Sequence, residues 1–360
     1  MQQINVTKTY LPPLEEYTAY LKGIWDRGHL TNQGPLLVEL EEKLRNYLGV
    51  KHLFVVNNGT IALQIAIKAL GLKNEIITTP FSYVATTSSI AWENCTPVFA
   101  DIDPKTLCMN PDEIKKKITP STSAILATHV YGNPCNVDSI KEIADTNKLK
   151  VIYDAAHAFG VNYKGISVLN YGDISTLSFH ATKLFHTIEG GAIITDNDEL
   201  AHKIGYMRNF GHNGPEAFFG AGINGKTSEF NAAMGLCILP KVSELIEARK
   251  RISKIYDELL KNTSLKKPEL TERTEYNYAY YPVLFETEEQ LLETRKRLNE
   301  NSIFPRRYFY PSLNTMNYVG KQDAPVSEEV SRRVLCLPLY YDLENDDVKK
   351  VAEIIKSLIE

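Results

Sequence analysis

Residues 151–183 decide the fold, and they read VIYDAAHAFGVNYKGISVLNYGDISTLSFHATK. The stretch holds two short apolar runs, at residues 151–154 and 175–179, that have the length and composition of buried strands. An acidic residue, Asp154, ends the first run, and Lys183 follows the second. In open α/β sheets, ligands bind beyond the carboxyl ends of the strands. The stretch therefore predicts a sheet edge that presents a carboxylate and an amine.

Short apolar runs alternate with amphipathic segments from residue 50 to about residue 200. This alternation predicts an α/β fold, with a mostly parallel, seven-stranded sheet between layers of helices. The predicted strands are residues 53–56, 76–79, 98–101, 124–128, 151–154, 175–179 and 192–195. The predicted helices between them are residues 61–70, 84–92, 111–118 and 138–147.

One further helix is predicted over residues 36–48, ahead of the first strand. Its leucines recur at helical spacing, so they are expected to face the core. Its acidic residues are expected to face the solvent, and these are Glu39, Glu41 and Glu42.

The chain changes character after residue 240. A long helical stretch is interrupted at Pro240 and continues over residues 242–260, and a charged connection follows it. A strand is then predicted over residues 276–285. We therefore expect a large α/β domain over residues 1–240 and a small α+β domain over residues 241–360.

Composition narrows the classes of protein to consider. The 360 residues include 40 Lys and Arg and 44 Asp and Glu, so the net charge of −4 offers no broad basic field for nucleic acid. No run of 18 apolar residues predicts a membrane span, and the first residues do not form a signal peptide. We expect a cytoplasmic protein without disulfides or a metal site, because its five cysteines form no C-x-x-C pair: Cys95, Cys108, Cys135, Cys237 and Cys336.

Three features of the predicted sheet edge carry the chemistry. Gly59 and Thr60 lie where a strand turns into a helix, and such a helix start offers free N–H groups to a phosphate, with Ser178 as a further donor. Taken singly, each feature has an ordinary explanation: a capped turn, a carboxylate that caps the next turn, and a surface lysine. Together with Asp154 and Lys183 they meet the needs of pyridoxal 5′-phosphate (PLP), which requires a phosphate site, an acid on its ring nitrogen and an amine on its aldehyde.

The sequence resembles the DegT/DnrJ/StrS family of PLP-dependent sugar aminotransferases, a branch of the fold type I PLP enzymes. The resemblance covers nearly the whole chain, and its central blocks are highly specific. The segments that carry it are residues 30–35, 58–63, 128–132, 154–158, 178–183, 222–226 and 335–339.

The resemblance implies a role for each matching residue. Lys183 would hold the cofactor covalently and would then move the proton between cofactor and substrate. Asp154 would bind the pyridine nitrogen, and His157 would lie close to the ring or its hydroxyl, although many relatives have Gln at this position. Tyr83 would stack on the ring. The phosphate would be bound by Gly59, Thr60 and Ser178.

The resemblance also implies a homodimer with shared active sites. Asn224 matches an asparagine that reaches the phosphate bound by the neighbouring subunit. The arginine that usually follows it is absent, and Lys226 is a candidate to replace it as a point charge.

The family acts on nucleotide-linked keto sugars, with L-glutamate as the amino donor. Residues 178–183 and 187–191 look like those of enzymes that aminate carbon 4 of a 6-deoxy-4-keto hexose. The expected reaction converts dTDP-4-keto-6-deoxyglucose and glutamate to dTDP-4-amino-4,6-dideoxyglucose and 2-oxoglutarate, for an O-antigen of lipopolysaccharide or a similar glycan. Amination of a dTDP-3-keto-6-deoxyhexose or of a UDP-linked 4-keto sugar is an alternative.

Two other classes of function stay open. A PLP-dependent sugar dehydratase is one, but the relatives that dehydrate carry His at the position of Lys183, which favours transamination here. The other is a binding or regulatory protein without turnover. Candidates for substrate contacts are Arg307 and Tyr308, near the diphosphate, unless the neighbouring arginines are simply solvated; His129, His186 and Lys226 are further candidates.

Overall fold

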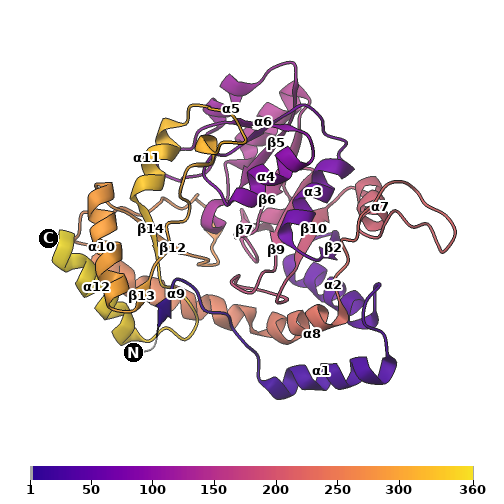
Figure 1. Cartoon of the computed structure of the whole chain (residues 1–360), viewed down its shortest axis with the longest axis horizontal. Coiled ribbons are helices and arrows are strands. Elements are labelled where there is room, and N and C mark those ends of the chain that lie inside the picture. The colour runs from indigo at the N-terminus through magenta and orange to yellow at the C-terminus, as the bar shows by residue number, and fades with distance from the viewer. Residues whose placement is uncertain (1–2, 360) are drawn as a thin grey trace.

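Seven strands form the central sheet of the computed structural model, which describes residues 3–359 (Figure 1). All seven predicted strands are present, and β10 alone runs antiparallel to its neighbours, so the predicted mostly parallel sheet is confirmed. In spatial order the strands are β2 (His52–Val56), β10 (Gly191–Thr195), β9 (Ile174–Ser178), β6 (Lys150–Asp154), β5 (Thr122–Thr128), β3 (Glu75–Thr78) and β4 (Thr96–Phe99).

Helices cover both faces of this sheet, because successive strand residues point to opposite sides and both sides are apolar. One face packs against α3 (Gly59–Ala69), α4 (Val84–Trp92) and α7 (Asp198–Met207). The opposite face packs against α1 (Leu14–Arg27), α2 (Pro35–Leu48), α5 (Pro111–Lys117), α6 (Val137–Asn147) and α8 (Glu229–Ile238).

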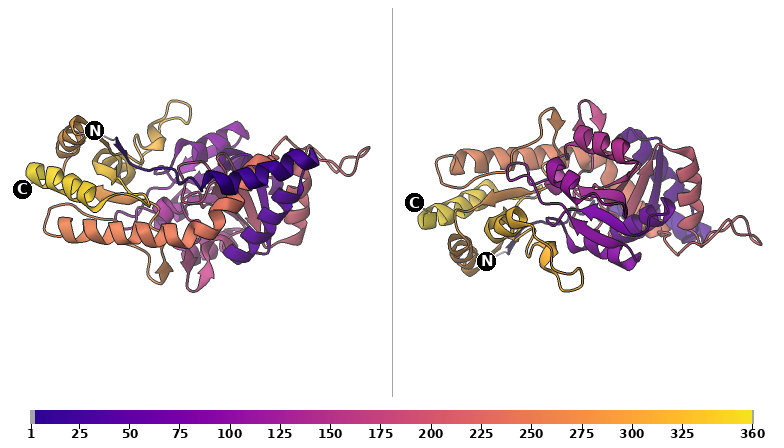
Figure 2. Two further views of the ribbon diagram at one scale, coloured as in Figure 1. Left: turned by 90° about the horizontal axis from the view of Figure 1, so that it is seen from below. Right: turned by 90° about the horizontal axis from the view of Figure 1, so that it is seen from above.

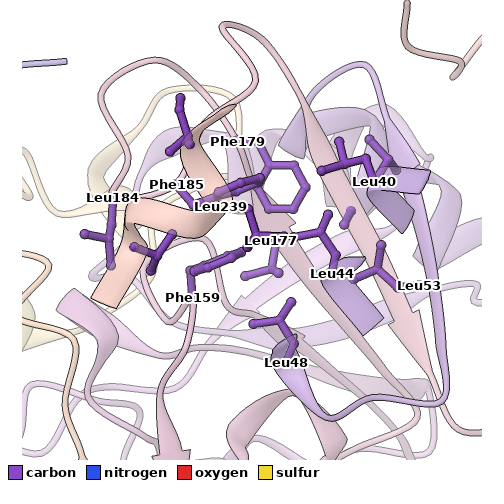
Figure 3. Close-up of a cluster of buried hydrophobic side chains, with 14 of the residues drawn as sticks. Leu40, Leu44, Leu48, Leu53, Phe159, Leu177, Phe179, Leu184, Phe185 and Leu239 are labelled. Carbon is purple, nitrogen blue, oxygen red and sulfur yellow. The ribbon is translucent and has the colours of Figure 1, made fainter. Parts of the chain in front are cut away.

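A cluster of leucine and phenylalanine side chains joins α2 to the sheet (Figure 3). Leu40, Leu44 and Leu48 recur along one side of α2 and are buried, as their helical spacing predicts. They lie near Leu177 of β9 and Phe159, so this part of the core supports the strand that leads to Lys183.

The prediction that Glu41 faces the solvent is wrong. This side chain is buried, because its Oε1 accepts a hydrogen bond from the N–H of Val55 at 2.8 Å and it forms an ion pair with Arg208. The Arg208 guanidinium also donates to the carbonyl of Val55 at 2.9 Å. A buried carboxylate is tolerated here because it is both paired and hydrogen-bonded.

The rest of the chain forms a second region around α9 (Val242–Leu260), which follows a short turn that contains Pro240. There β12 (Tyr281–Leu284) pairs with β14 (Val334–Leu337), and β1 (Ile4–Asn5) pairs with β13 (Ile303–Phe304). The amino-terminal strand therefore lies at the same end of the molecule as the carboxyl-terminal helix (Figure 2). The helices of this region are α10 (Glu288–Glu300), α11 (Pro325–Arg333) and α12 (Asn345–Ile359). The predicted domain boundary at residue 240 stays a prediction.

The strand predicted over residues 276–285 is shorter than expected, since β12 begins at Tyr281. The Asn277 amide donates to the carbonyls of His157 and Phe159 at 2.8 and 3.0 Å, which holds this stretch against the sheet's loops instead of in a ladder. Short strands nearby form a separate small sheet: β7 (Asn162–Tyr163), β8 (Ile166–Ser167) and β11 (Thr274–Glu275). Over the described part of the chain, no helix combines the length and apolarity needed to cross a membrane.

Candidate active site

A cavity of about 290 Å³ opens at the carboxyl ends of β2, β6 and β9. This is the sheet edge at which the sequence predicts a ligand site. The structure brings eight of the predicted site residues together around the cavity: Gly59, Thr60, Tyr83, Asp154, His157, Ser178, Lys183 and Tyr308.

Asp154 is the last residue of β6, and its side chain is buried. Its Oδ2 accepts a hydrogen bond from the Thr86 hydroxyl at 2.7 Å, and its Oδ1 accepts the N–H of Ala156 at 3.1 Å. Burial raises the pKa of the Asp154 carboxyl, whereas these two hydrogen bonds and the charge of Lys183 lower it. A cation at this position would therefore find an acceptor whose orientation is already set.

Lys183 lies in the turn that follows β9, where its N–H donates to the carbonyl of His180 at 2.9 Å. Burial lowers the pKa of the Lys183 ammonium to about 8, although the charges of Asp154 and Tyr83 oppose this effect. An amine with this pKa is in part neutral near pH 7, and only the neutral form attacks an aldehyde.

His157 lies in the wall of the same cavity and is held as a neutral ring. Burial lowers the pKa of its imidazole well below the usual value, and the charge of Lys183 adds to this effect. Its Nδ1 accepts the N–H of Tyr131 at 3.3 Å, so the ring proton lies on Nε2. The ring stacks parallel to Phe309 at 5.7 Å and meets the edge of Tyr280 at 4.9 Å.

The start of α3 forms a cradle for an anion. Asn58 caps this helix by accepting the N–H of Ile61. The N–H groups of Gly59 and Thr60 have no intrahelical partner, because they lie in the first turn. A Cβ on Gly59 would lie 3.0 Å from the Cβ of Ser178, and a Cβ on Gly191 would lie 2.7 Å from the backbone of Asn58. Glycine at both positions therefore lets the ends of β9 and β10 pack closely against the start of α3.

Aromatic side chains line the remaining wall. Tyr83 caps α4 and is 60 % exposed, so its ring is free to cover a ligand in the cavity. Tyr280, Tyr308 and Phe309 also line the cavity, and only Tyr308 among these three is a predicted site residue. Tyr280 lies in the strand predicted over residues 276–285 and Phe309 in no predicted element, and the sequence gives no signal that either residue reaches the cavity.

Asn224 and Lys226 line a different hollow of the same chain, together with Asn57 and Ser228. Asn224 is exposed, and the Lys226 ammonium lies 4.2 Å from the centre of the Phe210 ring. Both residues belong to the segment between α7 and α8, which projects beyond the sheet at the end opposite α12 (Figure 1). Glu189 lines both this hollow and the cavity of Lys183.

Two further candidate substrate contacts, His129 and His186, lie away from the cavity. His129 is fully buried, stacks on Tyr153 at 4.6 Å and accepts the N–H of Cys135 at 3.0 Å. His186 is also buried, and its Nε2 lies 2.8 Å from the carbonyl oxygen of Tyr10. The Nδ1 of His186 also accepts the N–H of Ile188 at 3.2 Å, and neither histidine lines the cavity of Lys183.

Arg307 is likewise turned away from the cavity. Its guanidinium pairs with Glu288 at 2.6 Å, donates to the carbonyl of Arg332 at 3.0 Å and lies 3.6 Å from the centre of the Tyr310 ring. These contacts fix Arg307 against α10 and α11, so the prediction that it reaches a substrate has no support in the position of the side chain.

The adjacent arginine, Arg306, lines a groove of about 530 Å³ beside the cavity. Arg295 of α10 lines the same groove, and within residues 3–359 neither guanidinium has an acidic partner. Among the residues that the structure describes, none that lines the groove is acidic, and the groove shares Thr182 and Tyr308 with the cavity. The groove is therefore a cationic hollow that adjoins the cavity of Lys183. Among the described residues, no group of three His, Cys, Asp or Glu side chains is arranged to hold a metal ion.

Comparison with known proteins places this geometry in one family. Residues 14–356 match the DegT/DnrJ/EryC1/StrS aminotransferase family. The chain is 43 % identical to a dTDP-4-amino-4,6-dideoxy-D-glucose transaminase of Shigella dysenteriae, over 99 % of each chain. It is 42 % identical to a transaminase of the same name from Escherichia coli, over 98 % of each chain.

The fold also matches solved structures of the same kind. The crystal structure of DesI in the presence of its TDP-sugar product superimposes with a TM-score of 0.94 at 32 % identity, over 99 % of this chain and 93 % of DesI. The fold, the family match and the full-length relatives agree with the resemblance drawn from the sequence. The chain belongs to the DegT/DnrJ/EryC1/StrS aminotransferase family.

Proposed function

We propose that this chain is a PLP-dependent transaminase that transfers the amino group of L-glutamate to carbon 4 of dTDP-4-keto-6-deoxyglucose. The products are dTDP-4-amino-4,6-dideoxyglucose and 2-oxoglutarate. The observation that carries the proposal is the convergence of Asp154, Lys183 and the α3 cradle on one cavity. Two relatives that are 43 % and 42 % identical over nearly their whole length carry the name of this reaction.

The residues of the cavity fit PLP in three places. The N–H groups of Gly59 and Thr60, with the Ser178 hydroxyl, would bind the phosphate, and the close approach of Gly59 to Ser178 supports this assignment. Asp154 would accept a hydrogen bond from the protonated ring nitrogen. Tyr83 would cover one face of the ring. When bound, PLP supplies an aldehyde for the amino group and a ring that withdraws electrons.

Lys183 would carry out the proton transfers, and His157 would hold the ring in place. The Nζ of Lys183 takes the proton from the α carbon of glutamate and later delivers a proton to carbon 4 of the sugar, a task suited to an amine whose pKa is about 8. His157 stays neutral and offers its Nε2–H as a donor, because Nδ1 is occupied by Tyr131. His157 would therefore orient the ring without taking part in proton transfer.

The groove of Arg295 and Arg306 would receive the diphosphate of the nucleotide sugar. The groove and the cavity share Tyr308 and Thr182 in their linings, so a sugar placed at Lys183 would extend its diphosphate toward the guanidinium groups of Arg295 and Arg306. Arginine matches phosphate oxygens in a fork geometry, which suits such a site.

A homodimer with shared sites would complete the pocket. Asn224 and Lys226 do not reach the cavity of their own chain, and the exposed aromatic Phe218 lies in the same projecting segment. Variants Lys183→Ala and Asn224→Ala, each inactive or weak alone, should regain about a quarter of the wild-type activity after their subunits are mixed, because some mixed dimers hold one intact site. Mixtures that stay at the level of the separate variants would exclude sharing.

The reaction itself is tested with a panel of substrates. Purified enzyme receives PLP, glutamate and a series of dTDP-, UDP- and GDP-linked 3-keto and 4-keto sugars, and the new amine is located by NMR. The expected result is amination at carbon 4 of the dTDP sugar, with one 2-oxoglutarate formed for each amine. Amination at carbon 3, or preference for a UDP-linked sugar, would replace the proposed substrate by one of the alternatives.

The panel also separates the other classes of function. A dehydratase would consume the sugar without forming 2-oxoglutarate, and a binding protein would leave every sugar unchanged. The supply of an O-antigen or similar glycan in the cytoplasm remains part of this proposal and depends on the sugar that the panel identifies.

A further inference from the structure

Three buried hydroxyl groups form a chain that ends on Asp154. Thr128 Oγ1 donates to Ser82 Oγ at 3.1 Å, Ser82 Oγ lies 2.8 Å from Thr86 Oγ1, and Thr86 Oγ1 donates to Asp154 Oδ2 at 2.7 Å. The first and last residues of this chain are neighbours in the sheet, because Thr128 of β5 is in register with Asp154 of β6. Ser82 lies two residues before α4 and Thr86 lies in its first turn, and all four side chains are buried.

The direction of these hydrogen bonds follows from their donors. An ionised carboxylate only accepts, so the single Thr86 proton must point at Asp154. Thr86 then has no proton left for Ser82, so Ser82 donates to Thr86. Its own oxygen accepts the proton of Thr128. All three O–H dipoles therefore point toward the carboxylate, and hydrogen bonds arranged head to tail polarise one another.

We propose that Thr128, Ser82 and Thr86 are positioning residues that keep Asp154 ionised and turned toward the cofactor ring. The chain occupies Oδ2, while the N–H of Ala156 occupies one side of Oδ1. Oδ1 therefore keeps a free lone pair for the ring nitrogen, and the carboxylate has no freedom to rotate. This inference rests on the proposed binding of PLP.

Burial makes such a device necessary. Removal from water raises the pKa of the Asp154 carboxyl, and the Thr86 hydroxyl is the largest influence that lowers it again. A protonated Asp154 would lose its attraction for a protonated ring nitrogen. The hydroxyl chain supplies the compensating dipoles without placing a second charge in the cavity.

The test uses the affinity of the apoprotein for PLP and the pH dependence of that affinity. Thr86→Val keeps the shape of the side chain and removes the hydroxyl. It should weaken PLP binding by about tenfold or more at pH 7, the range expected for one lost hydrogen bond to a charge. When the pH is lowered, the PLP affinity of Thr86→Val should begin to fall at a higher pH than that of the wild type, because Asp154 of the variant protonates more easily. Thr86→Ser should restore both properties.

Thr87→Val is the matched control. Thr87 lies next to Thr86 on α4, is equally buried, and its hydroxyl has no hydrogen-bond partner among the described residues. This variant should bind PLP like the wild type. Ser82→Ala and Thr128→Val act one and two bonds farther from the carboxylate, so they should give smaller effects of the same sign and keep the test valid if Thr86→Val does not fold.

The outcomes separate this inference from the proposed function. A wild-type apoprotein that binds no PLP would overturn the proposed function together with the inference. Normal PLP binding by the wild type with no change in Thr86→Val, or an equal loss in Thr87→Val, would overturn the hydroxyl chain alone. If Thr86→Val binds PLP more weakly but its affinity falls at the same pH as that of the wild type, only packing was lost. That outcome would also overturn the inference.

Discussion

The carboxyl edge of the central sheet and the segment that follows β13 both supply residues to the candidate site, but they differ in how their side chains are directed. At the sheet edge, Asp154, Ser178 and Lys183 lie around the cavity as the strand pattern predicts. After β13, Arg306 faces the groove, whereas its neighbour Arg307 points into an ion pair with Glu288.

This difference shows when the local sequence is sufficient to predict the direction of a side chain. In a buried parallel strand, alternation and sheet register decide where each side chain points, so the residue type and its position are sufficient. Arg306 and Arg307 follow a strand of only two residues. Their directions depend on Glu288, Tyr310 and the carbonyls of α11, and such tertiary contacts leave no mark in the local sequence.

The largest effect should come from the sheet edge. Lys183→Ala removes the amine that would move the proton, so transamination should fall by at least about a thousandfold, near the upper range for a lost acid–base group. Turnover is measured as 2-oxoglutarate formed per enzyme. Lys164→Ala, an exposed lysine in an ion pair with Asp138, is the control and should keep full activity. Comparable turnover in Lys183→Ala and the wild type would remove the sheet edge from the chemistry.

The two arginines provide the sharpest test of the comparison. Arg306→Ala should raise the KM for the dTDP sugar by about tenfold, with kcat nearly unchanged and the KM for glutamate less affected, because one exposed contact to the diphosphate is lost. Arg307→Ala should leave both KM values near those of the wild type. It should instead reduce the free energy of unfolding by about 1–3 kcal/mol, because Glu288 loses its partner.

The control for these variants is Arg297→Ala. Arg297 lies on α10 with Arg295, but it is exposed and pairs only with Glu300 at 3.5 Å. Arg297→Ala should leave the KM values near those of the wild type and should change the free energy of unfolding by no more than about 0.5 kcal/mol. A higher KM for the sugar in Arg307→Ala than in Arg306→Ala would reverse our assignment of the two arginines.

The phosphate cradle should show a smaller effect. Gly59→Ala places a Cβ 3.0 Å from the Cβ of Ser178, so one of the two must move and PLP affinity should fall by about three- to tenfold. The stability of the apoprotein should change little, because the preference of alanine for the helix offsets the displacement at Ser178. Gly205→Ala, on α7 with only an ordinary contact to Phe54 at 3.6 Å, is the control and should bind PLP normally. Unchanged affinity in both variants would argue against a phosphate at Gly59.

The smallest effect is expected from a change of pH. The rate of covalent PLP uptake by the apoprotein should rise about tenfold for each pH unit and level off above pH 8, where the Lys183 amine is mostly neutral. The charge of Asp154 raises the pKa of Lys183, so Asp154→Asn should move the half-point to lower pH. A rate that continues to rise toward pH 10 would mean that burial does not lower this pKa.

Much of the fold and the centre of the site were predictable from the sequence, because both follow from short-range periodicity. The seven strands and the residues at their carboxyl ends agree with the prediction. Glu41 was assigned to the solvent because its partner, Arg208, is far away in the sequence. His129 and His186 were candidates by residue type alone, and burial against Tyr153 and Tyr10 was not visible in the sequence. Thr86 and Phe309 reach the site through packing that no local pattern encodes.

The pairing of β1 with β13 has a practical consequence for anyone who purifies this enzyme. It brings Gln3, Asn5 and Thr7 to the rim of the groove proposed for the diphosphate. A bulky group attached at Gln3 or Asn5 would therefore lie beside the groove proposed for the diphosphate, where it would compete with the nucleotide for space. A label on α12 avoids that groove, because α12 contributes no residue to its described lining, and kinetic work on the sugar should leave β1 unmodified.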